Sequence, residues 1–505
     1  MTLSECSHNR YPPTRHLTAS SFQQTYEVSD HVGFQRLELD RHLQIPDALQ
    51  RFQGQPFLLL LDSAARHREQ DARYSFLAAD PIAIHRLDRA EFPMDPFQPL
   101  RHWQQQLAGL ATDAPADLPP FAGGIAGLMS YELGEAFERL PRPAPDDFRT
   151  PAILAGLFDW SIVWDHLTGT VTAWVLDLAS DVRRSLSTAD RLQWIQQHLE
   201  GPGVDTGSIP ASSEGSSDFQ PSGRYHQIEP TTEVYSDFSR DEYVSTVARV
   251  IEYIRAGDIF QANLSQRLLA PWQGTAVDLY RRVRQRNPAP FCGLLQHEDV
   301  AIVSASPERF LKVGGTGRVE TRPIKGTRRR QASPIADLFV GNELASSEKD
   351  RAENVMIVDL LRNDLSRSCG PGTVRVTGLC EIERFETVLH LVSTVVGQLR
   401  TNLDVWNLMA GCFPGGSITG APKIRAMEII AELERSVRGA YCGSFFACGP
   451  RGDFDSSILI RTFTMKGGWV QFPVGGGIVA DSDPLDEYRE TLHKASGMIR
   501  VLRGL

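Results

Sequence analysis

Short apolar runs joined by turns recur along this chain, and they constrain its fold more than any other feature. Residues 157–165 and 170–176 flank His166-Leu-Thr-Gly169, which predicts a β-hairpin. Further strands are expected at 56–63, 73–80, 82–84, 259–265, 301–304, 309–313, 318–324, 372–376, 391–399, 443–448, 455–464 and 469–479. Helices are expected at about 189–199, 240–256, 345–361, 403–411, 421–434 and 484–502. Because hairpins outnumber β-α-β units, we predict an α+β fold with antiparallel sheets.

A change of composition divides the chain into two parts. Residues 201–238 are rich in Gly, Ser, Pro and Thr and have little apolar periodicity, so they are predicted to be a linker or insert. Residues 34–200 before it form a sheet-rich region, preceded by a flexible polar lead over 1–33. Residues 239–505 start with a capping box, Ser239 and Glu242. The glycines within 121–129 predict close backbone packing rather than a helix.

Composition excludes several classes of protein. The net charge of −10 argues against nucleic-acid binding. No apolar run reaches the ~18 residues of a membrane span, and the N-terminus lacks the apolar region of a signal peptide. The seven cysteines are scattered without a Cys-x-x-Cys pair, which indicates reduced thiols and a cytoplasmic location.

Lys325 carries the most specific chemical hypothesis. It ends a strand-like run beside Gly326, which is expected to break the strand, and it lies among Arg322 and residues 328–330, all arginines. Neighbouring positive charge lowers the pKa of an ammonium group, and only the neutral amine is a nucleophile. The alternative is a solvated basic hairpin end.

Two predicted helices carry paired carboxylates. Asp350 and Glu353 lie at i and i+3 on one helix, as do Glu487 and Glu490 on the other, where Lys494 follows. Brought together, the two pairs would form an oxygen-only site that suits Mg²⁺. The alternative is that each pair lies on a solvated helix face.

Two glycine-rich segments could approach an anion. Residues 413–423 form a turn before a helix that Thr419 or Gly420 could cap, and free N–H groups at such a helix start attract anions. Gly475, Gly476 and Gly477 would let backbone N–H groups approach a ligand. Simple turn chemistry explains both segments equally well.

Three single residues complete the candidates from local pattern. Glu308 follows a strand directly and could act as a general acid or base. Arg461 lies in a strand-like run and could bind a carboxylate. His390 lies in an apolar run, where a histidine is more often a core residue than a catalyst.

Six motifs, in order, resemble the chorismate-utilising enzymes. They are Ser306-Pro-Glu308, Arg322-Pro-Ile-Lys-Gly-Thr327, Asp350-Arg-Ala-Glu-Asn354, Ile357-Val-Asp-Leu-Leu-Arg-Asn-Asp364, Phe413-Pro-Gly-Gly-Ser-Ile-Thr-Gly-Ala-Pro-Lys423 and Gly475-Gly-Gly-Ile-Val479. The resemblance is strong over 239–505 and weaker over 34–176. It implies one interwoven sandwich of two antiparallel sheets with surrounding helices, with chorismate as the substrate and Mg²⁺ as the cofactor.

The resemblance also implies roles for individual residues. Glu353 and Glu490 would bind the metal directly, with Asp350 and Glu487 in support. The substrate carboxylates would be held by Arg461, Lys494, Tyr441, Thr419 and the backbone of Gly475, Gly476 and Gly477. His390 would lie beside the reacting ring, and Glu308 would protonate the leaving C4 hydroxyl.

Two positions separate the family members. Members that make isochorismate or salicylate have a water-activating lysine where this chain has Gln261. Members that make anthranilate typically have alanine at the position of Lys325. Lysine at this position is typical of members that aminate chorismate at C4. We therefore expect the product 4-amino-4-deoxychorismate, formed through a covalent Lys325 adduct and used for 4-aminobenzoate and folate synthesis. Anthranilate, for tryptophan synthesis, is the alternative.

The resemblance finally implies a partner. The chain has no Gly-x-Cys-x-Gly motif of a glutamine amidotransferase, so a separate amidotransferase subunit is expected to supply ammonia. Leu60-Leu-Asp-Ser63 resembles a segment that relatives use to bind tryptophan. A non-catalytic protein with the same fold is disfavoured because all the expected metal-binding and proton-transfer groups are present.

Overall fold

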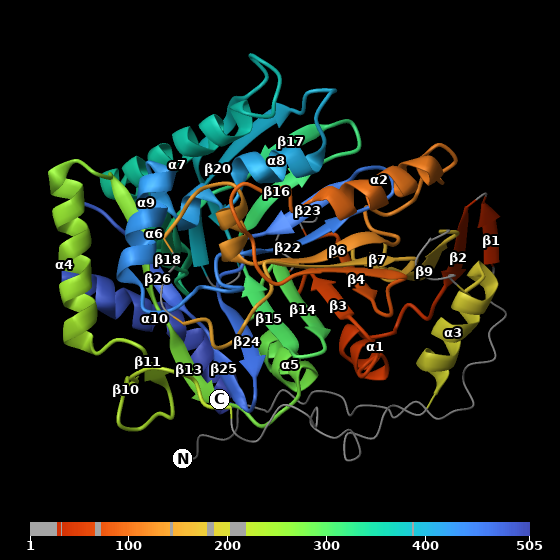
Figure 1. Cartoon of the computed structure of the whole chain (residues 1–505), viewed down its shortest axis with the longest axis horizontal. Coiled ribbons are helices and arrows are strands. Elements are labelled where there is room, and N and C mark those ends of the chain that lie inside the picture. Colours follow the sequence, from red (N-terminus) through yellow and green to blue (C-terminus); the bar gives the residue numbers. More distant parts are fainter. Residues whose placement is uncertain are drawn as a thin grey trace, which may run out of the picture.

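Two large antiparallel sheets form the body of the protein, and helices surround them (Figure 1). The computed structural model describes residues 28–31, 33–65, 72–141, 145–178, 186–201, 219–385 and 388–504. Every strand pair within these residues is antiparallel. The predicted fold class is therefore confirmed.

The larger sheet has thirteen strands. Their order is β1 (Val28–His31), β2 (Phe34–Glu38), β9 (Thr170–Leu176), β8 (Trp160–Asp165), β4 (Tyr74–Ala78), β3 (Leu58–Asp62), β14 (Phe291–His297), β15 (Val300–Ser306), β24 (Thr462–Lys466), β25 (Trp469–Gln471), β13 (Leu268–Pro271), β11 (Tyr235–Ser236) and β10 (His226–Gln227).

The second sheet has ten strands and a third has three. The ten-stranded order is β18 (Ile324–Arg329), β20 (Val388–Gln398), β17 (Arg318–Thr321), β16 (Arg309–Val313), β23 (Phe454–Ser457), β22 (Ser444–Cys448), β6 (Gly124–Met129), β7 (Ile153–Phe158) and β5 (Ala83–Leu87), with β19 (Arg375–Arg384) also paired to β20. The small sheet is β21 (Gly420–Ala421), β12 (Gln261–Gln266) and β26 (Val474–Ile478).

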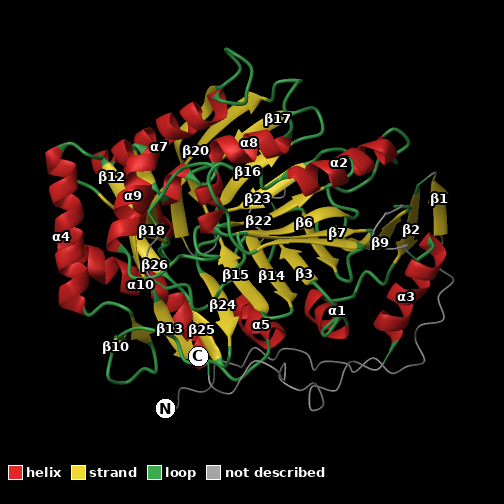
Figure 2. Ribbon diagram, viewed as in Figure 1, coloured by secondary structure: helices red, strands yellow, loops and turns green. Residues whose placement is uncertain are grey.

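Helices cover the outer faces and one end of the sheets (Figure 2). The α-helices of the described residues are α1 (Ile45–Arg51), α2 (Gln98–Ala111), α3 (Thr188–Glu200), α4 (Arg240–Ala256), α5 (Ala276–Arg286), α6 (Pro334–Ser346), α7 (Glu348–Ser366), α8 (Val405–Cys412), α9 (Lys423–Leu433) and α10 (Pro484–Arg503). Two 3₁₀ turns, η1 (Tyr131–Ala136) and η2 (Gly416–Ile418), complete them. None of these helices is long and apolar enough to cross a membrane.

Buried side chains define the layers. One apolar cluster takes residues from both large sheets, such as Leu59 and Ile302 from one and Leu128 and Phe445 from the other, so the sheets pack face to face. A second cluster joins the ten-stranded sheet to α2, α7 and α8. A third joins the thirteen-stranded sheet to α1, α3, α5 and α10, and a fourth joins the small sheet to α4 and α9. Burial of these faces removes apolar surface from water and drives this arrangement.

The N-terminal and C-terminal parts of the chain are interwoven in both large sheets. β5, β6 and β7 complete a sheet whose other strands come from after residue 300, and β3 pairs with β14. The change of composition at 201–238 is therefore not a boundary between two packed bodies. Residues 219–238, predicted as part of the linker, instead contain β10 and β11, and β11 pairs with β13. Residues 202–218, like 1–27 of the predicted lead, lie outside the described residues; 28–31 form β1.

Three predicted strands each prove to be two. The run 157–165 divides at Asp159 into β7 and β8, which belong to different large sheets. The run 455–464 divides in the same way, into β23 and β24. The run 469–479 divides into β25 of the thirteen-stranded sheet and β26 of the small sheet. An apolar run continues through such a crossing because both of its halves are buried, so periodicity does not reveal it.

The glycines of β6 confirm the predicted close backbone packing. A Cβ atom on Gly127 would lie 2.1 Å from the carbonyl oxygen of Leu154 in the neighbouring strand. Contacts this short force the backbones apart.

We expect Gly127→Ala to lower the free energy of unfolding by about 3 kcal/mol, because overpacking moves a strand between two partners. Gly109→Ala is the matched control: Gly109 is exposed on α2 with open space around it, so alanine should stabilise the helix by about 1 kcal/mol. Denaturant unfolding of both variants measures the difference. Equal stabilities would contradict the strand packing described here.

Candidate active site

Lys325 lies within β18 rather than at its end. Gly326 adopts a φ of +72° and does not end the strand, which continues to Arg329. The register against β20 shifts between Lys325 and Thr327, which marks a β-bulge. A glycine with positive φ accommodates a bulge without steric cost. The predicted strand break at Gly326 is therefore wrong.

Ser417 joins Lys325 to Glu308. The Lys325 Nζ donates a hydrogen bond to the main-chain oxygen of Ser417 at 3.1 Å, and the Ser417 hydroxyl donates to Oε1 of Glu308 at 2.9 Å. Glu308 and Ser417 are buried, and Lys325 is partly buried. An amine and a carboxyl that are far apart in the sequence thus meet at η2.

Burial changes the pKa of both groups in opposite directions. Burial is the main cause that lowers the pKa of the Lys325 amine, and Lys494 adds to it. The carboxylates of Glu308, Glu353 and Glu490 oppose this effect without outweighing it. Burial raises the pKa of Glu308, against the positive charge of Lys325 and the hydrogen bond from Ser417. Both shifts favour the uncharged forms, a neutral amine and a protonated acid.

The neighbouring arginines do not cause the shift, so that part of the prediction is wrong. Arg322 pairs with Glu383, and Arg330 pairs with Asp337 at 2.9 Å. Arg328 lies 3.0 Å from Asp350. Their charges are neutralised locally by carboxylates that the chain supplies from α6, α7 and β19.

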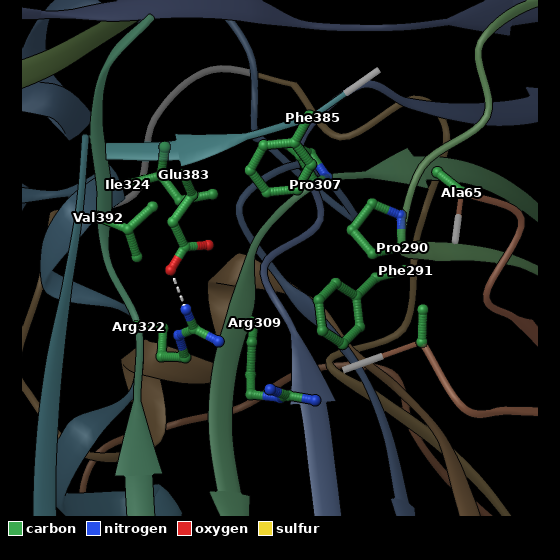
Figure 3. Close-up of a pocket in the computed structure, with 11 residues that line it drawn as sticks. Ala65, Pro290, Phe291, Pro307, Arg309, Arg322, Ile324, Glu383, Phe385 and Val392 are labelled. Atoms are coloured by element: carbon green, nitrogen blue, oxygen red, sulfur yellow. Dashed lines mark hydrogen bonds and ion pairs between the residues drawn. The ribbon is translucent and has the colours of Figure 1, made fainter. Parts of the chain in front are cut away.

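A small pocket lies beside Lys325 and Glu308 in the sequence, and one of these arginine–carboxylate ion pairs lines it (Figure 3). Pro307 and Ile324 line it, each one residue before Glu308 or Lys325, and the Arg322–Glu383 pair forms part of its wall. None of the predicted catalytic, substrate-binding or metal-binding residues lines this pocket. It is distinct from the space where Lys325 and Glu308 meet.

The four predicted metal-binding carboxylates lie on α7 and α10. Asp350 pairs with Arg328, and Glu490 pairs with Lys494 at 2.7 Å. The Ser482 hydroxyl donates to Glu487, which is buried rather than on a solvated face. Glu353 has no ion pair or hydrogen bond with any described residue. Across the described part of the chain, no three His, Cys, Asp or Glu side chains converge closely enough to hold a metal ion as they stand.

The carboxylates nevertheless act on one another. Burial raises the pKa of Glu353, and Asp350 and Glu490 raise it further. Burial likewise raises the pKa of Glu487, and Glu490 contributes. Burial also opposes ionisation of Glu490, but Lys494, Lys349 and Lys325 together outweigh it and the pKa falls. An all-oxygen donor set whose members repel one another is chemically suited to a hard divalent cation such as Mg²⁺.

The three glycines of β26 lie between β12 and α10. A Cβ atom on Gly476 would lie 3.3 Å from Oε2 of Glu487 and 3.6 Å from Nζ of Lys494, so this glycine faces the carboxylates. Lys494 also donates to the Gly475 carbonyl at 3.1 Å. At Gly477, a Cβ would overlap the amide of Gln261. Glycine at these positions therefore leaves room for polar side chains of the site.

Thr419 is fully buried at the end of η2, and its hydroxyl donates to the Gly415 carbonyl at 3.0 Å. It does not cap a helix. Gly420 belongs to β21, which pairs with β12, and Pro422 is the N-cap of α9. The predicted capping by Thr419 or Gly420 is wrong because the small sheet takes up these residues before the helix begins.

Tyr441 and Thr419 come together around Asn263. The main-chain N–H of Asn263 donates to the Thr419 carbonyl at 2.7 Å. Burial raises the pKa of Tyr441 well above its ordinary value, and the side chain of Asn263 is among the groups that counteract this rise. Arg438 lies over the Tyr441 ring at 5.8 Å.

His390 and Arg461 come from other elements, β20 and the segment just before β24. His390 is buried on β20, within 2.8 Å of the Thr327 hydroxyl and edge-on to the Phe385 ring. Arg461 adopts a φ of +53° just before β24. Burial lowers the pKa of Arg461, and no described carboxylate forms an ion pair with it. A partly buried guanidinium without a carboxylate is suited to an anionic ligand.

Sequence patterns missed several residues of the site. No role is predicted for Ser417, Glu434, Arg438 or Asn263. Gln261, Asn263 and Ser265 are polar residues at every second position of β12. That polar alternation within an otherwise buried strand was the available signal. Glu434, four residues before Arg438, is a local partner, but such a pair is also found on exposed surfaces. The carbonyls of Ile418 and Asn263, which hold Arg438 in the core, are farther away in the sequence.

The paired amine and acid, the facing carboxylates and the glycine-rich strand are those of a chorismate-utilising enzyme. Residues 57–500 match the family described as chorismate binding enzyme, and the chain belongs to this family. The chain is 37% identical to aminodeoxychorismate synthase component 1 of Klebsiella aerogenes, over 90% of this chain and 97% of that protein.

Anthranilate synthases are equally similar. Component 1 from Thermus thermophilus is 38% identical over 88% of this chain and 92% of its own length. The crystal structure of anthranilate synthase component I from Streptococcus pneumoniae superposes with a TM-score of 0.68 and 30% identity, covering 85% of this chain and 92% of that one. The protein is thus a chorismate-utilising enzyme of the aminodeoxychorismate or anthranilate synthase component I type.

Proposed function

We propose that this enzyme aminates chorismate at C4 to give 4-amino-4-deoxychorismate. The observation that carries the proposal is the Lys325–Ser417–Glu308 arrangement, in which burial favours a neutral amine beside a protonated acid. A neutral lysine is a nucleophile, and a protonated carboxyl is a general acid. This pairing suits a displacement that starts with amine attack and ends with loss of a hydroxyl.

The reaction proceeds in two balanced steps. The Lys325 amine attacks C2, the ring double bonds shift, and the C4 hydroxyl leaves as water with a proton from Glu308. Ammonia then adds at C4, the double bonds shift back, the Lys325 amine leaves from C2, and the ammonium formed at C4 returns a proton to Glu308. The covalent adduct divides a difficult displacement into two easier steps.

The remaining predicted residues bind and orient the substrate. Arg461, Lys494, Tyr441 and Thr419, with the N–H groups of Gly475 to Gly477, hold its carboxylates, and His390 lies beside the ring. Mg²⁺, held by Glu353 and Glu490 with Asp350 and Glu487 in support, would neutralise a substrate carboxylate when bound.

A separate glutamine amidotransferase subunit supplies the ammonia. The similarity to component 1 of two-component synthases supports this partner. The product then enters 4-aminobenzoate and folate synthesis.

Product analysis tests the proposal directly. The purified chain, given chorismate, MgCl₂ and an ammonium salt, should form 4-amino-4-deoxychorismate, identified by chromatography and mass. Anthranilate as the product would instead establish the alternative function, anthranilate synthesis. The 38% identity to an anthranilate synthase is the reason to test for it. Inhibition by added tryptophan would also favour that alternative.

We expect Glu490→Gln to raise the Mg²⁺ concentration needed for half-maximal activity at least about tenfold, because a neutral amide is a weaker ligand than a carboxylate. A Mg²⁺ titration of the amination rate measures this. Glu432→Gln is the control, since Glu432 contacts Arg249 and Tyr253 on the outer side of α4. An unchanged Mg²⁺ requirement in Glu490→Gln would count against the metal assignment.

A further inference from the structure

Asn263 has a buried donor that the protein does not use. Its side chain is 7% exposed on β12, and its Nδ2 atom has no hydrogen-bond partner among the described residues. An unsatisfied buried amide costs free energy, so such an atom needs an explanation. Gln266, on the same strand, shows the usual arrangement: its Nε2 donates to Thr491 and its Oε1 accepts from Ser236, both at 2.6 Å.

The neighbours of Asn263 are the residues proposed to bind the substrate. It pairs with Gly477 across the small sheet, and its N–H donates to the Thr419 carbonyl. Its side chain lies close enough to the Tyr441 phenol to lower the pKa of that group by hydrogen bonding to its ionised form. The unused donor therefore lies beside residues that are proposed to bind the substrate.

Arg438 and Glu434 hold Asn263 in this position. The guanidinium of Arg438 forms a two-point ion pair with Glu434 and donates to the Asn263 carbonyl at 2.6 Å and to the Ile418 carbonyl at 2.9 Å. Glu434 in turn accepts from the N–H and hydroxyl of Ser265, two residues along β12, both at 2.8 Å. Arg438 and Glu434 are both buried, so the position of the strand and of η2 is fixed by charge-assisted bonds.

We propose that Asn263 is a further substrate-contacting residue, whose Nδ2 donates a hydrogen bond to a carboxylate of the bound substrate. Arg438 is its positioning residue. The inference rests on the proposed function, since it takes chorismate as the ligand. In the free enzyme the unsatisfied donor costs free energy, and a hydrogen bond to the substrate removes this cost. The contact therefore contributes to substrate affinity rather than to the stability of the fold.

Two substitutions of Asn263 test this proposal. Substrate binding should weaken in both, whereas the stability of the fold should not fall in Asn263→Leu. Asn263→Leu is close in volume and removes the donor, so KM for chorismate should rise about tenfold with kcat within threefold, because bonds to charged groups are of this strength. Asn263→Asp places a carboxylate against a carboxylate, and KM should rise about a hundredfold. Thermal unfolding of the substrate-free Asn263→Leu protein should occur at the same or a higher temperature, because an unsatisfied group has been removed.

Gln266→Leu is the matched control. It removes an amide of the same strand whose bonds are satisfied within the protein, so its unfolding temperature should fall while KM stays unchanged. Unchanged KM in both Asn263 variants would overturn the inference. So would a raised KM in Asn263→Leu accompanied by a loss of stability like that of Gln266→Leu. A wild-type enzyme that neither binds nor converts chorismate would instead refute the proposed function itself.

Discussion

Lys325→Ala should abolish the covalent adduct and lower the amination rate at least about a thousandfold, because no other group can take the place of an activated nucleophile. Intact-protein mass spectrometry of enzyme mixed with chorismate and MgCl₂, without ammonium, measures the adduct. The wild-type protein should gain the mass of chorismate less water. The variant should show the unmodified mass.

Two controls separate nucleophilicity from charge. Lys325→Arg keeps a positive group that does not deprotonate, so it should lose the adduct as completely as alanine does. Lys312→Ala, on strand β16 of the same sheet, removes a lysine outside the site and should leave adduct and rate intact. Substantial amination by Lys325→Arg would show that Lys325 acts through its charge, and an unchanged adduct in Lys325→Ala would assign the nucleophile to another residue.

Glu308→Gln should lower kcat about a hundredfold to ten-thousandfold, the usual contribution of a positioned general acid. Its pH dependence should also change. Burial raises the pKa of Glu308, so the acid form persists to higher pH than in a solvated glutamate, and the wild-type rate falls as pH rises through this raised pKa. Glutamine has no proton to lose, so the variant should lack that fall.

Rates at saturating chorismate and ammonium across the pH range measure this effect. On the low-pH side both proteins should lose activity as Lys325 becomes protonated. Glu320→Gln serves as the control, because Glu320 lies on β17, partly exposed and away from Ser417. A fall at high pH that persists in Glu308→Gln would assign it to a different group.

Individual helices and strands were predicted better from the sequence than the way in which they pair and pack. The capping box of α4 and the hairpin between β8 and β9 are local patterns, and both are present. The helices α1, α2, α5 and α6 were not predicted, although α5 has its own capping box. The crossings between sheets, as at Asp159, were missed because the burial of the residues on either side is the same in both sheets.

The site shows the same division between local and distant information. Motif order placed Lys325, Glu308 and the carboxylates in one enzyme family, and the family is confirmed. The cause of the Lys325 shift was wrong, because the partners of Arg322 and Arg328 come from β19, α6 and α7. Asn263 gains its meaning from contacts with Thr419 and Arg438, which lie more than a hundred positions away.

Lys325 and Glu308 both form a hydrogen bond with Ser417, so the protons of the two groups are considered together. A neutral amine beside an acid and an ammonium beside a carboxylate hold the same number of protons, so they are tautomers of one state. In the pH range between the first and the last proton loss of the pair, pH does not change the ratio of the two tautomers. The polarity around Ser417 does change this ratio. Admitting water to this position would therefore favour the ammonium–carboxylate tautomer and slow the enzyme at every pH on the plateau.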